Sequence, residues 1–450
     1  MLHPVEPFKI KVVEPIYFTT REEREKRIAK VHYNLFFLGS KWVTIDLLTD
    51  SGTSALSEEQ WAHLMRGDEA YSGARSYERF EEAVKEFTGM PYILPVHQGR
   101  AAENIIAFNL VEKGDIAVAN TFFDTTRANL EVHGAIVFDF LTKEAGDIKR
   151  DYPFKGNMDT EALRKFMKRE GKRVKIIGMT MTNNTGGGQP VSMKNLKEVV
   201  DIARDNGVHL LLDACRIAEN AYFIKEREEE YKDKEISEII REIFSYFDIA
   251  YMSAKKDGLA NIGGFIAVKD ENLMEKFQEK LILTEGFPTY GGLSGREMET
   301  ITIGLKEVIK EEYLRYRIEQ VRYLARKFED LGVTVLRPPG GNAVFVDAGE
   351  ILSHIPKGNF PGQALAIVLY IEGGVRTFEA GSLTLGKRNE VKYELLRFAI
   401  PRRVYTQSHL DFVVEVFKET LKKKDKVRGV KIVYEPPYLR HFLAKFELVT

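Results

Sequence analysis

Short apolar runs alternate with amphipathic stretches along the chain from about residue 80. Apolar runs bounded by polar residues or glycine predict buried strands, and apolar residues spaced by three and four predict helices. Strands are expected in YILPVH (92–97), DIAVAN (115–120), GAIVFDFL (134–141), VKIIGMTM (174–181), VHLLLDA (208–214) and FDIAYMSA (247–254). Helices are expected in YERFEEAVKEFTG (77–89), RAAENIIAFNLVEKG (100–114) and SMKNLKEVVDIARDNG (192–207). This alternation predicts a mostly parallel sheet with helices on both faces.

A different pattern begins after a charged segment near 296–330, which predicts one long helix. The strand-like segments NAVFVDAG (342–349), YELLRFAI (393–400) and KIVYEP (431–436) then alternate with helices, which is typical of an α+β domain. Residues 1–48 include the helix-like REEREKRIAKVHYN (21–34) and are interpreted as an N-terminal arm and part of the small domain. We therefore expect a large domain over 49–310 and a C-terminal small domain over 311–450.

Composition narrows the class of protein. A chain of 450 residues can bury the cores of two domains. Its 66 basic and 67 acidic residues nearly balance, so charge gives no reason to expect a nucleic acid or an anionic membrane as partner. The single cysteine, Cys215, excludes an internal disulfide and a cysteine-cluster metal site. There is no signal-peptide pattern and no apolar run of about 18 residues, so we expect a cytoplasmic location.

A lysine pair, Lys255 and Lys256, lies between two apolar segments, 249–252 and 262–268. Most such pairs are solvated surface features, but these flanking segments are strand-like. A desolvated ammonium tends to lose its proton, and a neighbouring lysine disfavours its charged form further. A free amine is what Schiff-base chemistry requires. The pair therefore indicates a lysine that binds an aldehyde cofactor.

A phosphate site is expected where the strand YILPVH meets the next helix. Ligands of an open α/β sheet bind beyond the carboxyl ends of its strands. Gln98, Gly99 and Arg100 occupy such a strand-to-helix turn, and helix N-terminal N–H groups bind anions. Ser253, three residues before Lys256, offers a hydroxyl to the same phosphate.

Other strand ends carry groups that suit an aromatic cofactor. Asp213 ends an apolar strand and Arg216 follows it, which is either a simple ion pair or a pair for the ring nitrogen and phenolate oxygen of pyridoxal phosphate. Phe123 is either a core residue or a ring that stacks on the cofactor, and Asp124 lies beside it. Asn184 offers an amide in a glycine-rich loop; a nucleotide-binding loop is disfavoured because GxxxxGK[ST] is absent.

These segments, together with IDLLTDSGT (45–53), GDEAYSG (67–73), EGFPTYGGL (285–293), IPRRVYTQSH (400–409) and YEPPYLRHF (434–442), closely resemble the β-eliminating lyases, the family of tryptophanases and tyrosine phenol-lyases. The resemblance implies the pyridoxal phosphate fold type I, which is aspartate aminotransferase-like. That fold is α/β, with a large domain around a mostly parallel seven-stranded sheet and a smaller α+β domain. It also implies a potassium ion, an amino-acid substrate and a homotetramer built as a dimer of dimers.

The resemblance further assigns roles by position. Lys256 would form the covalent imine with the cofactor and remove the substrate α-proton, and Tyr71 would protonate the leaving group. The other cofactor-binding residues would be Gln98, Gly99, Arg100, Phe123, Asp213, Arg216, Ser253 and Lys255. The substrate carboxylate would be bound by Thr49, Asn184 and Arg402. The potassium ligands would be the Glu69 carboxylate and the carbonyls of Gly52 and Asn261.

Three positions bear on the substrate. The phenol-lyase branch has an arginine for the phenol hydroxyl where this chain has Ala380, and the tryptophanase branch has an aspartate and a histidine that match Asp124 and His441. We therefore expect β-elimination of L-tryptophan to indole, pyruvate and ammonia. The alternatives are a tyrosine phenol-lyase, a lyase for other β-substituted amino acids, a noncatalytic cofactor-binding assembly protein and a nucleotide-binding protein.

Overall fold

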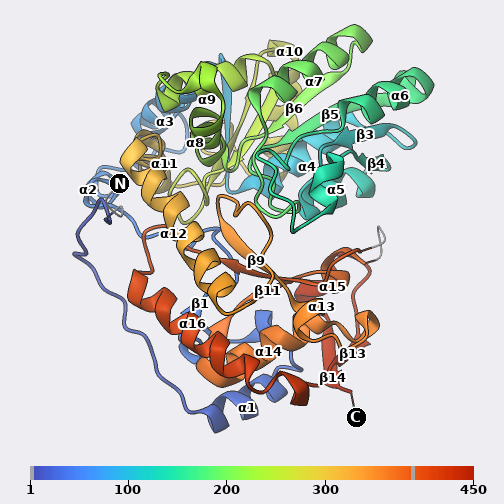
Figure 1. Cartoon of the computed structure of the whole chain (residues 1–450). Coiled ribbons are helices and arrows are strands. Elements are labelled where there is room, and N and C mark those ends of the chain that lie inside the picture. The colour runs from blue at the N-terminus through green and yellow to red at the C-terminus, as the bar shows by residue number, and fades with distance from the viewer. Residues whose placement is uncertain (1–4, 387–390, 450) are drawn as a thin grey trace. The chain divides into compact units, whose positions relative to one another are not determined.

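The computed structural model describes residues 5–386 and 391–449 (Figure 1). The chain divides into two compact units. Unit 1 contains Ser51–Asp147 and Tyr152–Ile318, and unit 2 contains Val5–Asp50, Ile148–Asp151 and Glu319–Thr450. Each unit is described by itself.

Unit 1 is built on a seven-stranded sheet. Its strands lie in the order β2 (Tyr92–Val96), β8 (Gly264–Val268), β7 (Ile249–Ser253), β6 (His209–Asp213), β5 (Val174–Thr180), β3 (Ile116–Ala119) and β4 (Ile136–Asp139). Strand β8 runs antiparallel to both of its neighbours, β2 and β7, and the other neighbouring pairs of this sheet are parallel. The expected mostly parallel sheet of an α/β fold is therefore confirmed.

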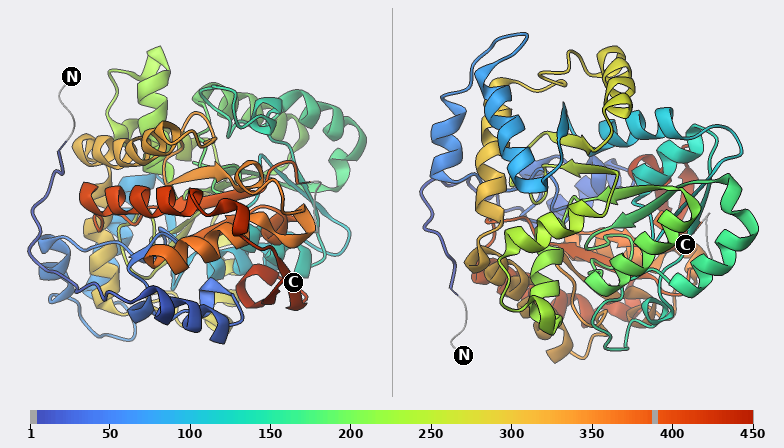
Figure 2. Two further views of the ribbon diagram at one scale, coloured as in Figure 1. Left: turned by 60° about the horizontal axis from the view of Figure 1, so that its bottom comes forward. Right: turned by 90° about the horizontal axis from the view of Figure 1, so that it is seen from above.

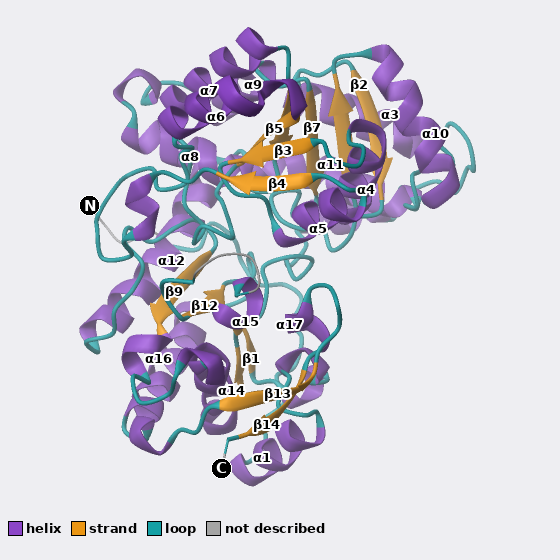
Figure 3. Ribbon diagram, turned by 90° about the vertical axis from the view of Figure 1, so that its right-hand side faces the viewer, coloured by secondary structure: helices purple, strands orange, loops and turns teal. Residues whose placement is uncertain are grey.

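Side chains of alternate strand residues enter two separate cores, because successive side chains of a strand point to opposite faces. On β6, Leu210 and Leu212 belong to one core and Leu211 to the other. The first core is covered by α3 (Arg75–Thr88), α6 (Thr160–Glu170), α7 (Met193–Asn206), α8 (Ile217–Arg227), α9 (Ile236–Ser245) and α11 (Gly295–Val308). The second is covered by α4 (Gly99–Leu110), α5 (Asp124–Val132) and α10 (Glu271–Thr284). Helices therefore lie on both faces of the sheet (Figure 3).

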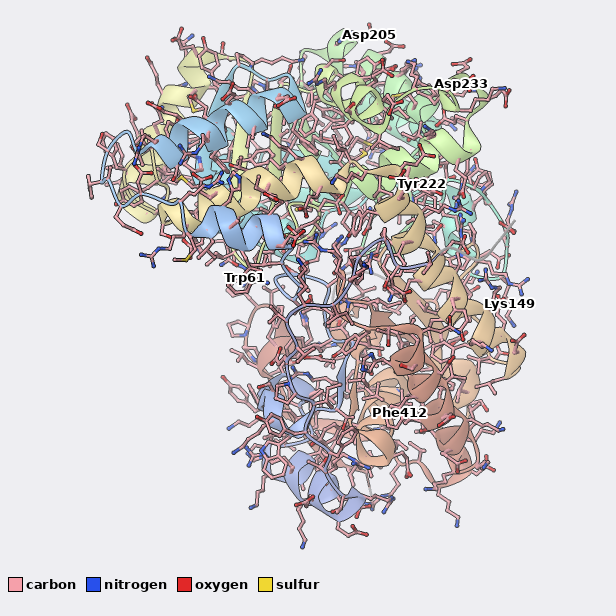
Figure 4. The ribbon with its side chains drawn as sticks, turned by 90° about the vertical axis from the view of Figure 1, so that its left-hand side faces the viewer. Trp61, Lys149, Asp205, Tyr222, Asp233 and Phe412 are labelled. Carbon is pink, nitrogen blue, oxygen red and sulfur yellow. The ribbon has the colours of Figure 1, made fainter. Side chains whose placement is uncertain are left out.

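Local signals explain several helix ends. Ser192 caps α7 by accepting a hydrogen bond from the Asn195 N–H, and Gly207 ends it with a φ of 62°. Gly89 ends α3 in the same left-handed conformation, as the sequence indicated. Charged side chains lie on the outside, including Asp205 of α7 and Asp233 (Figure 4).

The prediction of one helix near 296–330 is wrong. The structure has α11, which ends at Val308, and α12 (Glu311–Asp330). Ile309 and Lys310 between them are not helix breakers, so the pattern of residues shows no interruption. Helix α11 packs against α3 and α2 (Glu58–Leu64), and tertiary contacts of this kind routinely outweigh intrinsic propensity.

Unit 2 contains a three-stranded antiparallel sheet in the order β11 (Phe378–Ala380), β12 (Leu395–Ala399), β9 (Ala343–Asp347). Two further pairs are β1 (Ile45–Asp46) with β10 (Val375–Arg376), and β13 (Val430–Tyr434) with β14 (Lys445–Leu448). Its helices are α1 (Arg21–Lys30), α13 (Ala348–Ile351), α14 (Pro361–Gly373), α15 (Ser382–Leu385), α16 (Gln407–Leu421), α17 (Arg440–Leu443) and most of α12. The orange α14 and the red α16 lie side by side (Figure 2). Every helix in the described residues is too short or too polar to cross a membrane.

Candidate active site

The carboxyl ends of β6 and β7 bring one carboxylate to a buried position. Asp213 is the last residue of β6 and is 7% exposed. It lies opposite Tyr251 in the register of β6 and β7, on the sheet face that α4 and α5 cover. Its Oδ1 accepts a hydrogen bond of 3.0 Å from the Cys215 N–H. This contact fixes the side chain on the face where the first turns of α4 and α5 begin.

The start of α4 lies directly against the end of β7. Gly99 is the first residue of α4, and a Cβ built on it would lie 2.8 Å from the Cβ of Ser253. The first N–H groups of a helix have no intrahelical partners, and the helix dipole adds positive potential there. Gln98 precedes the helix, and its Nε2 lies 2.9 Å from the His97 Nε2. The structure thus brings the predicted turn and Ser253 together into one cradle, which could hold an anion.

Positive side chains gather at the same place. Burial lowers the pKa of Lys255, and the charges of Lys256 and Arg100 lower it further. Lys255 thus has two cationic neighbours whose charges act on its amine. The Nζ of Lys256 lies 5.8 Å from the centroid of the Phe123 ring. A lysine amine and a flat ring are therefore close together in unit 1, and Lys256 follows Ser253 of the cradle by three residues.

The remaining predicted residues of unit 1 lie on adjoining elements. Phe123 precedes α5, and Asp124 begins it, with its Oδ1 accepting a hydrogen bond of 2.8 Å from the Thr125 N–H. Arg216 is buried before α8, and its carbonyl accepts a hydrogen bond of 3.1 Å from the Thr182 hydroxyl. Asn184 lies in the loop between β5 and α7.

Sequence reasoning missed Glu103, which lies one turn into α4 and is 5% exposed. Burial raises the pKa of its carboxyl to about 7, and the charge of Asp213 contributes to this rise. One feature of the sequence could have revealed Glu103: it is a single glutamate among alanine and isoleucine residues of a predicted helix, between Ala102 and Ile106, which belong to a core. The pattern of residue types along the sequence does not by itself distinguish a buried glutamate from an exposed one.

The predicted residues of unit 2 include a buried arginine. Arg402 is fully buried, and its Nη1 donates to the Asp50 Oδ2 over 2.9 Å and to the Asp50 carbonyl over 3.1 Å. Asp50 is 1% exposed and was also missed from the sequence, although it follows Thr49 directly. A paired, oriented guanidinium is well suited to bind a carboxylate.

His441 and Ala380 also belong to unit 2. His441 is 3% exposed and lies among aromatic rings, with its ring centroid 5.5 Å from that of Phe378 and 4.1 Å from that of Phe442. Phe378 begins β11, the strand that Ala380 ends. His441 is therefore embedded in an aromatic cluster that includes the strand of Ala380.

The predicted cation ligands are only partly brought together. The Asn261 Nδ2 lies 3.3 Å from the Gly52 carbonyl, whereas the Glu69 carboxylate pairs with the Arg296 Nη2 at 3.0 Å. In the residues that the structure describes, no group of three or more His, Cys, Asp or Glu side chains is arranged to hold a metal ion. The cation site stays a prediction.

Tyr71 is 71% exposed, and its ring packs against that of Tyr290 at a centroid distance of 5.2 Å. Hydrogen bonding with Tyr290 raises the pKa of the Tyr71 phenol. The role of Tyr71 as a proton donor also stays a prediction.

The residues of unit 1 fit a cofactor that carries a phosphate, an aldehyde and a basic ring nitrogen. Gly99 leaves space that a side chain would fill, Asp213 supplies a buried acceptor, and Lys256 supplies the amine near a flat ring. This combination defines a pyridoxal phosphate-type enzyme of fold type I. Solved structures support the fold: an aspartate aminotransferase from Thermotoga maritima matches with a TM-score of 0.63 at 13% identity, covering 89% of this chain and 95% of that chain. A serine palmitoyltransferase from Sphingomonas wittichii matches with a TM-score of 0.60 at 14% identity, covering 90% and 97%.

The family follows from sequence comparison. The model of the family described as Beta-eliminating lyase matches residues 46–416, and the chain belongs to this family of enzymes. A tryptophanase from Salinibacter ruber is 51% identical over 447 residues, which cover 98% of this chain and 94% of the relative. A tyrosine phenol-lyase from Symbiobacterium sp. is 48% identical over 452 residues, which cover 99% of both chains. The predicted resemblance is confirmed, but the two named activities occur at similar identity and do not distinguish the substrate.

Proposed function

We propose that this β-eliminating lyase acts on L-tryptophan and releases indole, pyruvate and ammonia. The observation that carries the choice is Ala380, whose methyl group at the end of β11 cannot hydrogen-bond a phenol hydroxyl. Asp124 and His441 match positions of the tryptophanase branch and can hydrogen-bond a polar N–H. The similar identity of tyrosine phenol-lyases makes that activity the second candidate.

The cradle at Gly99 and Ser253 would bind the phosphate of pyridoxal phosphate. Asp213 would accept a hydrogen bond from the protonated ring nitrogen, Arg216 would face the phenolate oxygen, and Phe123 would stack on the ring. When bound, the cofactor supplies an electron-withdrawing ring that stabilises negative charge at the substrate α-carbon.

The side chains of this chain would then bind the substrate and move its protons. In unit 2, Arg402, oriented by Asp50, would bind the substrate carboxylate together with Thr49. The Lys256 amine, which lies near the Phe123 ring, would act as the base that removes the α-proton. Tyr71 would donate a proton to the leaving carbon, because an unprotonated indole carbanion is too basic to depart.

A potassium ion and a homotetramer are further parts of the proposal. The ion would be bound by Gly52, Asn261 and Glu69, which requires the Glu69 carboxylate to leave its present pair with Arg296. All-oxygen ligation suits a hard cation. Replacing potassium by a tetraalkylammonium ion of equal concentration is expected to reduce turnover.

The test is to incubate the purified protein with pyridoxal phosphate, potassium and either L-tryptophan or L-tyrosine, and to quantify indole, phenol and pyruvate. Indole with matching pyruvate is expected. Phenol from tyrosine would establish the second candidate, and neither product from a protein that binds the cofactor would refute both.

Three variants test the assigned roles. Lys256→Ala is expected to lose the absorbance of the covalently bound cofactor. Asp124→Ala and His441→Ala are expected to impair tryptophan turnover more than turnover of small β-substituted alanines, which lack an indole. Equal losses on both substrate types would contradict the indole-recognition roles.

A further inference from the structure

Glu103 is a charged residue type in an apolar setting. The face of α4 on which it lies is otherwise formed by residues such as Ala102, Ile105 and Ile106, which belong to the core beneath the sheet. Its side chain is more than nine-tenths buried, and within the described residues its Oε2 has no hydrogen-bond partner. A buried carboxyl group with an unpartnered oxygen costs free energy of folding, so its presence here points to a function.

The hydroxyl groups nearest to Glu103 come from the first turn of α5. Hydrogen bonds from the Thr125 and Thr126 hydroxyls to its carboxyl group lower its pKa, but burial raises this pKa by more. The Thr126 Oγ1 in turn lies 2.9 Å from the phenol oxygen of the fully buried Tyr251. Thr125 is two residues after Phe123, so contacts at Thr125 and Thr126 fix the segment that presents the Phe123 ring.

The charged and titratable groups around Glu103 come from two strands and the turns that follow them. Asp213 at the end of β6 and Lys256 after β7 both act on its carboxyl group, with opposite effects. Burial and the charge of Asp213 raise the pKa of the Cys215 thiol and of the Tyr251 phenol, so both stay neutral. Asp213 is thus surrounded by groups that resist a second negative charge.

Two neighbouring carboxyl groups in a buried site do not ionise together easily, and one of them keeps its proton. Burial raises the pKa of Glu103 to about 7 although the Thr125 and Thr126 hydroxyls oppose this rise, and its Oε2 has no hydrogen-bond partner among the described residues. The proton is therefore expected on Glu103.

We propose that Glu103 is a positioning residue that works as a neutral acid. It fixes the start of α5, and with it Phe123, while it leaves Asp213 as the single negative charge for the cofactor ring nitrogen. The inference rests on the proposed use of pyridoxal phosphate, but it does not depend on which amino acid is the substrate. Glu103 is assigned no contact with substrate or cofactor.

Infrared difference spectroscopy of the cofactor-loaded enzyme tests the protonation state. At pH 6, the spectrum of the wild type is expected to contain the carbonyl stretching band of a neutral carboxylic acid. The spectrum of Glu103→Gln is expected to lack this band. The control is Glu112→Gln, which removes an exposed carboxyl group just beyond the end of the same helix and is expected to retain the band. Identical spectra of the wild type and Glu103→Gln would overturn the proposal.

Cofactor titration tests the positioning role without any turnover. Glu103→Gln, which stays neutral and polar, is expected to bind pyridoxal phosphate within about threefold of the wild type. Glu103→Leu, which removes the polar contacts, is expected to weaken binding by about tenfold. If Glu103→Gln binds the cofactor as weakly as Glu103→Leu, the charged form of Glu103 is required. If Glu103→Leu binds it as tightly as the wild type, Glu103 does not position the cofactor site. Either result overturns the proposal.

Thr126→Val provides a second route if Glu103→Leu does not fold. Valine keeps the shape of threonine but removes the hydroxyl between Glu103 and Tyr251, so weaker cofactor binding and a changed circular dichroism of the bound cofactor are expected. No change in either signal would count against the proposal. If the wild type itself fails to bind pyridoxal phosphate, the proposed function fails, and that result is distinct from a failure of the Glu103 variants.

Discussion

Gly99→Ala is the sharpest steric test of the phosphate cradle. The added Cβ would lie 2.8 Å from the Ser253 Cβ and 3.5 Å from its Cα. The first distance is roughly 1 Å shorter than the ~3.5–4.0 Å that two carbon atoms prefer. The start of α4 must therefore move away from the end of β7, and its N–H groups move with it. Overpacking of this kind costs about 1–3 kcal/mol.

If that cost falls on cofactor binding, the Kd for pyridoxal phosphate rises by about 5- to 150-fold, since each 1.4 kcal/mol is a factor of ten. The assay is a titration of the cofactor-free protein followed by absorbance or by quenching of intrinsic fluorescence. Alanine is a better helix former than glycine, so helix propensity alone predicts no loss. The matched control is Gly146→Ala, whose added Cβ meets no atom within 4 Å. Unchanged cofactor affinity in Gly99→Ala would refute the reasoning that this turn holds the phosphate.

Three further predictions concern unit 2. Asp50→Asn is expected to raise the KM for tryptophan and for small β-substituted alanines alike by about tenfold or more, because it removes the carboxylate that pairs with the buried Arg402 guanidinium; a KM that stays constant would contradict the positioning of the guanidinium. Burial and the neighbouring Glu394 raise the pKa of Glu379 to about 7, above its ordinary value of 4.5, so its contribution to stability is present at pH 4.5 and lost as the pH rises through 7. In urea unfolding, the free energy of unfolding of Glu379→Gln is expected to fall less between pH 5 and pH 8 than that of the wild type. An equal fall in both proteins would contradict this role of Glu379. Phe328→Ala, which empties a fully buried site packed against two rings at 4.7 and 4.8 Å, is expected to lower the free energy of unfolding of unit 2 by about 3–5 kcal/mol, and a loss below about 1 kcal/mol in urea unfolding would show that the core closes around the cavity.

The sheet and the cofactor side of the site could be predicted because they follow from local patterns. Apolar runs gave the strands, and the carboxyl ends of parallel strands meet at one edge. The proximity of Gly99 to Ser253, and of Lys256 to Phe123, is therefore a consequence of strand order and of the turns that follow each strand. Once the strands are mostly parallel, few other arrangements of the turns at their carboxyl ends exist.

Other features depend on packing that no local pattern encodes. The break after Val308 has no glycine or proline to announce it. Glu103 and Asp50 are charged residues that sequence patterns place on the surface, and only their burial beside Asp213 and Arg402 shows their importance. Their roles emerge from pairwise contacts between segments that are distant in the chain.

Charged groups of unit 1 fall into two sets that would suit the two ends of the proposed cofactor. Arg100, Lys255 and the start of α4 create positive potential for a phosphate, whereas Asp213 is the negative group on the face that Glu103 shares. Both groups lie at strand ends and helix starts of unit 1, and neither includes Asp124 or Ala380. Under the proposed function, the same two groups would serve β-elimination of either amino acid. Tryptophanases and tyrosine phenol-lyases match the chain at similar identity, so the proposed preference for tryptophan rests on individual residues outside both groups, of which Ala380 is the one that argues against a phenol.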